Sequence, residues 1–106
     1  MISAETIRIT TIVENSTAAG NVQAEWGISV FIEAGESCFL LDTGTTDMVV
    51  RNADRLGLDL DKAEALILSH GHYDHTGGLE AVLQRIRRSE LRIVAHPDVF
   101  SRKYSY

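Results

Sequence analysis

Apolar and polar residues alternate along several short segments of this chain, a pattern typical of half-buried β-strands. Over residues 6–13, Ile7, Ile9 and Val13 share one face of an extended segment. Runs rich in β-branched or apolar residues predict further strands over residues 27–34, 37–41, 64–69 and 91–95. The first two of these runs are separated by two residues, Gly35 and Glu36, which suits a tight hairpin.

Two other segments repeat apolar residues at helical spacing. Val49, Ala53 and Leu56 predict one helix, with a threonine at position 45 or 46 as its cap and Gly57 at its end. A second helix is predicted over residues 79–86, where apolar residues recur at i, i+3, i+4 and i+7. Pro97 suits the first turn of a short final helix. The order of elements predicts an α/β (α+β) domain with a mixed sheet and helices on one face.

Length and charge narrow the choice of function. The chain has 106 residues, enough for one domain and too few for two. Its net charge is −5, which disfavours binding to nucleic acid or to an anionic membrane surface. A single cysteine and a first segment without the pattern of a signal peptide favour a cytoplasmic location.

Three of the four histidines fall within Ser69-His-Gly-His-Tyr-Asp-His75, directly after the most apolar strand. Residues two apart on an extended segment project to the same side, so His70 and His72 can bind one metal ion. Asp74 and His75 can then bind a second. Nitrogen and carboxylate ligands suit Zn, with Fe or Mn as alternatives. Solvated loop histidines and a structural zinc are the other interpretations, although structural zinc sites usually include cysteine.

The segment with these histidines resembles the metallo-β-lactamase superfamily, whose signature is His-x-His-x-Asp-His between a strand and a helix. The wider string Ile67-Leu-Ser-His-Gly-His-Tyr-Asp-His-Thr-Gly-Gly-Leu79 carries the resemblance, together with Phe39-Leu-Leu-Asp-Thr-Gly44 and Ala95-His-Pro-Asp-Val-Phe100. It is similar to a branch that contains dihydropterin-type ribofuranosylaminobenzene phosphate synthases. The resemblance implies an αββα sandwich, of which residues 1–106 form a partial domain, the N-terminal half. Further metal ligands would come from a second half, so we expect the chain to be a fragment.

The resemblance also implies roles for individual residues. His70 and His72 match ligands of the first metal ion, while Asp74 and His75 match ligands of the second. Asp74 is implied to be catalytic, close to the hydroxide. Two further residues are implied to support the site, namely Asp42, which would orient the ligands without binding metal, and His96, which would line the substrate pocket.

The leading hypothesis is a metal-dependent hydrolase that uses a metal-activated hydroxide and one or two Zn ions. Its substrate would be a small-molecule ester, a lactone or a phosphorylated compound. A non-catalytic metal-binding half-domain and an iron-dependent oxidoreductase on the same fold are the alternatives. Because a sheet with helices on one face leaves the other face apolar, we also expect a possible homodimer that completes the half-domain.

Overall fold

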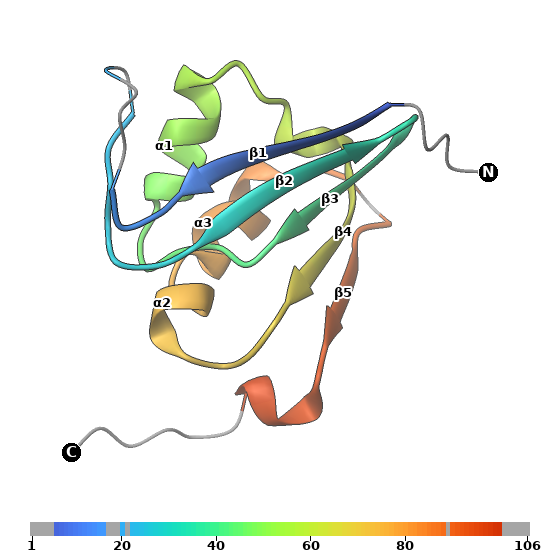
Figure 1. Ribbon diagram of the computed structural model, residues 1–106. Helices are drawn as coiled ribbons and strands as arrows, with labels where there is room; N and C mark the ends of the chain where they lie inside the picture. Colours follow the sequence, from blue (N-terminus) through green and yellow to red (C-terminus); the bar gives the residue numbers. More distant parts are fainter. Residues whose placement is uncertain (1–5, 17–19, 21, 89, 101–106) are drawn as a thin grey trace.

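The computed structural model describes residues 6–16, 20, 22–88 and 90–100. Figure 1 shows one sheet in front of its helices. The strands are β1 (Ile7–Val13), β2 (Ser29–Ala34), β3 (Ser37–Leu41), β4 (Ala63–Leu68) and β5 (Arg92–Ala95). The helices are α1 (Met48–Arg55), α2 (Tyr73–Thr76) and α3 (Leu79–Arg85), with short 3₁₀ turns η1 (Leu60–Lys62) and η2 (Pro97–Phe100).

The five strands lie in the sheet in chain order, β1-β2-β3-β4-β5. The first three are antiparallel neighbours, and β2 and β3 form the expected hairpin. The last three are parallel, because α1 connects β3 to β4 and α3 connects β4 to β5. The sheet is therefore mixed, as the sequence predicts.

The hydrophobic core lies between the sheet and helices α1 and α3, which pack behind the sheet in Figure 1. Phe31, Leu40 and Leu66 are the largest fully buried side chains of the strands. They belong to one core cluster with Val49 of α1 and Val82 of α3. Helices on one face of the sheet are thus confirmed.

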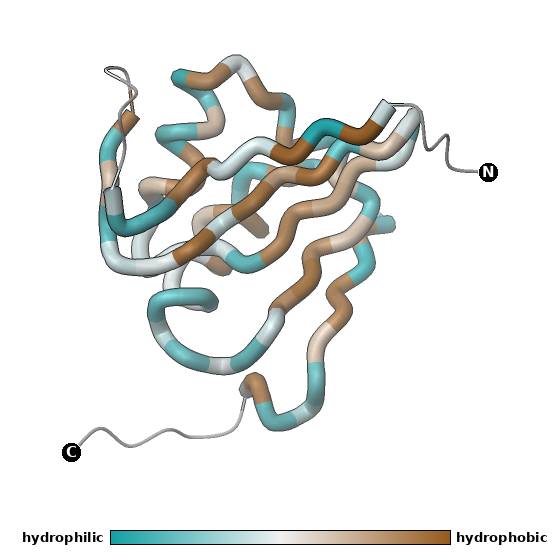
Figure 2. Tube along the Cα trace, in the orientation of Figure 1, coloured by the Kyte–Doolittle hydropathy of each residue, from teal (hydrophilic) through white to brown (hydrophobic). Residues whose placement is uncertain are grey.

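The opposite face of the sheet carries no helix among the described residues. Strand register places a second set of side chains there, and Figure 2 shows apolar residues along all five strands. The members of this set are Ile7, Ile9, Thr11, Val30, Ile32, Ala34, Ser37, Phe39, Leu41, Ala65, Ile67, Arg92 and Val94. We call this set the open face.

Several local boundaries differ from the sequence-based predictions. Helix α1 begins at Met48 after Asp47, and Thr46 contributes by accepting a hydrogen bond from the Met48 amide at 3.1 Å. In α3, Leu83 is exposed although its spacing predicts burial, because the helix is short and only one side of it meets the sheet. Within the described part of the chain, no helix has the length and apolar character to cross a membrane.

Candidate metal centre

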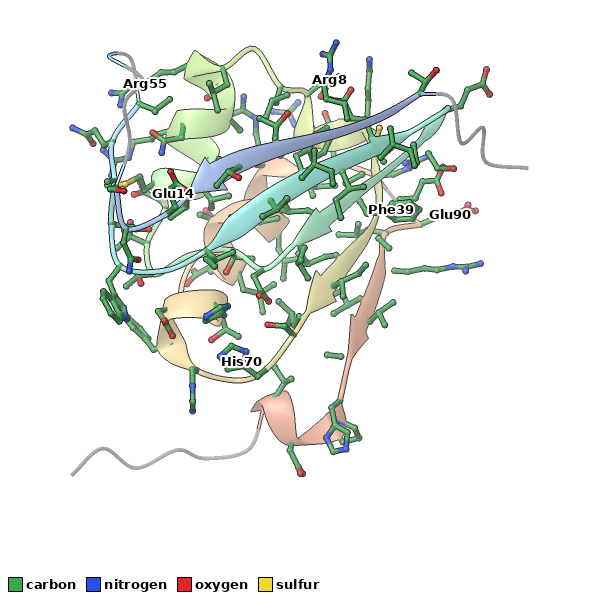
Figure 3. The ribbon with its side chains drawn as sticks, viewed as in Figure 1. Arg8, Glu14, Phe39, Arg55, His70 and Glu90 are labelled. Atoms are coloured by element: carbon green, nitrogen blue, oxygen red, sulfur yellow. The ribbon has the colours of Figure 1, made fainter. Side chains whose placement is uncertain are left out.

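The histidine-rich segment lies at one end of the sheet, where β3 and β4 both terminate. These strands are parallel, so their carboxyl ends meet at the same edge. Figure 3 shows His70 in the connection between β4 and α2, just beyond the end of β4. Asp42 follows β3, and its amide donates a hydrogen bond to the Ile67 carbonyl at 2.8 Å. Residues far apart in the chain are thereby brought to one edge.

Two imidazoles and one carboxylate converge at this edge. His70, Asp74 and His75 each offer a ligand atom, and these atoms lie within 4.8 Å of one another. His75 Nε2 is 3.5 Å from Asp74 Oδ2, and the rings of His70 and His75 have centroids 4.0 Å apart. His72 lies outside this group of three and is exposed, with its ring edge-on to His70 at a centroid distance of 4.8 Å.

The buried carboxylate of Asp42 forms hydrogen bonds that orient this cluster. Asp42 is 2% exposed, and its Oδ2 lies 2.8 Å from His75 Nδ1. The carboxylate also accepts the amide hydrogen of Ser69 at Oδ1 (2.8 Å) and the hydroxyl hydrogen of Ser69 at Oδ2 (2.6 Å). Asp42 has a φ of 57°, a left-handed conformation that Asp and Asn adopt more readily than most residues. Its backbone is therefore bent so that the side chain meets both neighbours.

These hydrogen bonds determine which ring nitrogens carry protons. Because an ionised carboxylate only accepts hydrogen bonds, Nδ1 of His75 must donate to Asp42, which leaves Nε2 of His75 with a free lone pair. Ser69 has one hydroxyl hydrogen, which it donates to Asp42. Its oxygen must then accept from His70 Nδ1, 2.9 Å away, so Nε2 of His70 is also free. One carboxylate thus sets the tautomers of both histidines, and for His70 it acts through Ser69.

Thr43 holds the histidine-rich segment at the end that lies in helix α2. Its amide and its hydroxyl both donate to the His75 carbonyl, at 2.8 and 3.0 Å, and its Oγ1 accepts from the Gly78 amide at 3.1 Å. A Cβ at Gly78 would lie 2.3 Å from the Thr43 carbonyl oxygen, and one at Gly77 would lie 2.0 Å from the Thr45 carbonyl oxygen. Both glycines are required by this close approach of two backbones.

A hollow of about 320 Å³ opens beside the cluster. It is lined by Ser69, His70, Gly71, His72, His96, Asp98 and Val99. His96 is exposed, and its Nδ1 accepts a hydrogen bond from the Asp98 amide at 3.1 Å. Nε2 of His96 therefore carries the proton when the ring is neutral. The structure places His96 at a surface shared with two of the expected ligands, and its role with substrate stays a prediction.

Sequence reasoning missed Ser69 and Thr43, although both lie next to expected site residues. Ser69 directly precedes His70, and Thr43 directly follows Asp42. A hydroxyl residue at the end of an apolar strand, adjacent to a ligand, is the available signal. This signal does not identify the hydrogen-bond partner of Ser69, because Asp42 lies 27 positions away in the sequence.

Comparison with known proteins yields relatives along most of this chain. A protein of Methanocaldococcus jannaschii, "Uncharacterized protein MJ0448", is 33% identical over 94 residues, which are 89% of this chain and 36% of the relative. The 7,8-dihydropterin-6-methyl-4-(β-D-ribofuranosyl)-aminobenzene-5′-phosphate synthase of the same organism is 34% identical over 104 residues, with 91% of this chain and 34% of the relative covered. The chain thus spans about a third of the length of these two relatives.

Solved structures agree with the sequence relatives. Rm3 metallo-β-lactamase is 27% identical with a TM-score of 0.53, over 66% of this chain and 26% of the other. A metallo-β-lactamase-like structure from Thermotoga maritima, 17% identical, shows the same fold over 82% of this chain and 42% of its own, with a TM-score of 0.54. The family model described as "Metallo-beta-lactamase superfamily" matches residues 27–105. The chain therefore belongs to the metallo-β-lactamase superfamily, which includes metal-dependent hydrolases.

Proposed function

We propose that this chain is the metal-binding part of a hydrolase that acts on a small-molecule ester, lactone or phosphorylated substrate. The observation that carries the proposal is the pair of imidazoles whose Nδ1 atoms are both engaged, directly or through Ser69, by Asp42. His75 Nε2 lies 3.5 Å from Asp74 Oδ2, and a ring nitrogen of His70 lies within 4.8 Å of both groups. Histidine ligands of metal ions are typically oriented in this way by a carboxylate behind the ring.

The donor set fits a divalent ion such as Zn, with Fe and Mn as alternatives. Two imidazole nitrogens and a carboxylate oxygen provide three protein ligands, the number found in catalytic zinc sites, which keep a further position open. His72 would add a ligand after rotation of its exposed side chain. When bound, such an ion polarises a substrate oxygen and lowers the pKa of water to about 7.

The residues around the ion have separate tasks in this proposal. Asp42 and Ser69 hold the rings of His75 and His70 in place, so binding requires little reorganisation. Asp74 is partly exposed beside His75 and can bind metal or hold a proton of the attacking water. His96 lines the hollow next to His70, and its Nε2–H is a donor for a hydrogen bond to an oxygen of the substrate.

A phosphorylated or pterin-like substrate is favoured among the three classes. One relative is named as the synthase of a dihydropterin-linked ribofuranosyl phosphate, and that relative is 34% identical over 91% of this chain. Other similar proteins are named hydroxyacylglutathione hydrolase, but they match half of this chain at most.

The test is hydrolysis of chromogenic probes by the chain with Zn²⁺, Mn²⁺ or Fe²⁺ added separately. The probes are p-nitrophenyl acetate, a chromogenic lactone and bis-p-nitrophenyl phosphate. We expect metal-dependent turnover that Asp74→Ala abolishes. The matched control is Asp54→Asn, which changes a carboxylate paired with Arg85. Full turnover by Asp74→Ala would refute the site assignment.

A non-catalytic metal-binding module is the second candidate. It is favoured by the small number of ligands for a site with two ions, since the three residues that converge in the described part of the chain suffice for one ion. Tight binding of one ion per chain, without hydrolysis of any probe, would support it. Metal analysis that finds no iron in the active protein would exclude the iron-dependent oxidoreductase, which requires iron in the site.

A further inference from the structure

Residues 25–28 pack against the main chain of Asp74, and we call these four residues the strap. The Ile28 amide donates a hydrogen bond to the Asp74 carbonyl at 3.3 Å. A Cβ at Gly27 would lie 2.3 Å from the same carbonyl oxygen, and the φ of Gly27 is 140°. Only glycine fits this contact without strain, because it has no Cβ. The strap therefore lies directly against the backbone of a residue in the candidate metal centre.

The carboxylate of Glu25 attaches the strap to residues 43–46, the turn that follows β3. Its Oε1 accepts hydrogen bonds from the amides of Thr45 and Thr46, both at 3.2 Å, and its Oε2 accepts one from the Thr46 hydroxyl at 2.8 Å. The Thr45 hydroxyl also donates to the Trp26 carbonyl. Hydrogen bonds to an ionised carboxylate are stronger than those between neutral groups. Glu25 is therefore the main link between the strap and the turn.

The same turn also bonds to the histidine-rich segment and to the end of α2. The Gly44 amide donates to the Ile28 carbonyl of the strap at 2.9 Å, and the Gly44 carbonyl accepts a hydrogen bond from the Gly78 amide at 3.2 Å. The first residue of the turn binds the His75 carbonyl through its amide and its hydroxyl. The turn thus holds the main chain of His75, and the strap holds that of Asp74. These two supports are joined by one carboxylate.

We propose that Glu25 is a positioning residue, which keeps the Asp74 carboxylate beside the ring of His75 by fixing the strap. This inference rests on the proposed role of Asp74 at the metal ion. Asp74 Oδ2 lies 3.5 Å from His75 Nε2, too far for a strong hydrogen bond, and the Asp74 side chain is partly exposed. The main chain of Asp74 must therefore fix its carboxylate. Asp42 orients the imidazoles, whereas Glu25 acts through the backbone on the third ligand.

Two substitutions at Glu25 separate its hydrogen bonds from its charge. Glu25→Ala removes all three bonds to the turn, whereas Glu25→Gln keeps one oxygen for the two amides and an NH₂ group that can donate to the Thr46 hydroxyl. Calorimetric titration of the full chain with Zn²⁺ should show a loss of affinity of about tenfold for Glu25→Ala, at the lower end of the range for groups that orient metal ligands. Glu25→Gln should bind Zn²⁺ nearly as tightly as the wild type. Thr45→Val, which removes only the bond to the Trp26 carbonyl, should show a smaller loss.

Amide hydrogen exchange of the metal-free protein distinguishes positioning from a general loss of stability. Glu25→Ala should speed exchange at the amides of α2 more than at those of β4, because the strap and the turn both bond to the main chain of α2. The matched control is Asp59→Ala, which removes a carboxylate that accepts a hydrogen bond from the Asp61 amide before β4, at the other end of the sheet from the metal centre. It should leave the Zn²⁺ affinity and the exchange of α2 unchanged.

Wild-type Zn²⁺ affinity in Glu25→Ala would overturn the proposal, as would a Glu25→Gln variant that binds as weakly as Glu25→Ala. Equal acceleration of exchange in α2 and β4, or an equal effect of Asp59→Ala, would also overturn it, because Glu25 would then stabilise the whole fold. If Glu25→Ala does not fold, wild-type affinity and exchange in Thr45→Val overturn the proposal by themselves. A wild type that binds no Zn²⁺ would refute the metal site, while exchange in the metal-free protein still tests the strap, so the two failures are distinguishable.

Discussion

Replacement of Asp42 by Asn tests the idea that one carboxylate sets both histidine tautomers. The substitution keeps the size and shape of the side chain. It also suits the backbone, because Asn tolerates the left-handed conformation seen at this position, with φ at 57°. Any effect on the site therefore comes from hydrogen bonding and charge.

The structure gives the direction of the effect. The carboxylate accepts three hydrogen bonds, two from Ser69 and one from His75, whereas an amide has one acceptor oxygen. If the amide nitrogen faces His75, the ring must accept at Nδ1 and carry its proton on Nε2, the atom that would bind metal. The Ser69 hydroxyl would turn in the same way towards His70. In the opposite orientation the amide nitrogen would face the Ser69 N–H group. Two hydrogen-bond donors would then face each other, so this orientation is disfavoured.

The expected magnitude is a loss of metal affinity of about 10- to 100-fold, the usual cost of losing a group that orients a metal-binding histidine. Calorimetric titration with Zn²⁺ measures the affinity. Nitrogen NMR of the imidazoles in the metal-free protein reports the tautomers directly, with Nδ1–H in the wild type and Nε2–H in Asp42→Asn. The control is Asp47→Asn, an exposed carboxylate paired with Arg51.

A variant with wild-type Zn²⁺ affinity and unchanged tautomers would refute the reasoning. Loss of affinity with unchanged tautomers would also contradict it, because the charge of Asp42 alone would then be responsible.

Three other predictions follow from the described contacts. Ser69→Ala should shift the tautomer of His70 and leave that of His75 unchanged, and imidazole NMR resolves the two rings. Burial, with a further contribution from Glu33, raises the pKa of the Cys38 thiol above its ordinary value. As the pH rises, the Cys38 thiol therefore ionises in the unfolded chain before it does so in the folded chain. The free energy of unfolding, measured with urea, should be retained below pH 9 and fall above it. Cys38→Ser should remove this part of the pH dependence. Gly78→Ala should destabilise the fold by about 2–3 kcal/mol, because its Cβ would overlap a backbone oxygen. Gly57→Ala should cost about 1 kcal/mol, because its surroundings are open and only its φ of 72° opposes the change. Equal melting temperatures of these two variants would contradict that ranking.

Much of the fold was accessible from the sequence because its strands have a strong local signal. The alternation of Ile7 and Ile9 with polar residues, the apolar run before Ser69 and the Gly35-Glu36 turn each reflect short-range constraints. All of these strands and the hairpin are present in the structure. The start of α1 was less predictable, because Thr46 and Asp47 are both good capping residues and the choice depends on contacts of the preceding loop with Glu25.

The candidate site also has a part that the sequence predicts and a part that it does not. The histidine-rich segment was found from residue type and spacing, and three of its four expected ligands converge in the structure. The hydrogen bonds that orient them were not predictable, because they join the ends of two strands that become neighbours only in the folded sheet. Asp42 was expected to support the cluster through the family resemblance, whereas its connection to His70 requires the position of the Ser69 hydroxyl.

The parallel pairing of β3 and β4 has a consequence for how the protein folds. Asp42 and Ser69 meet only after the chain has passed through α1 and returned to the sheet, a loop whose closure is slow compared with the β2–β3 hairpin. We therefore expect the site to form late in folding, and a metal ion bound there would link the ends of β3 and β4. At a free concentration 100 times its Kd, the ion would stabilise the folded chain by about 2.7 kcal/mol. Refolding in the presence of metal should thus reveal when this crossover closes.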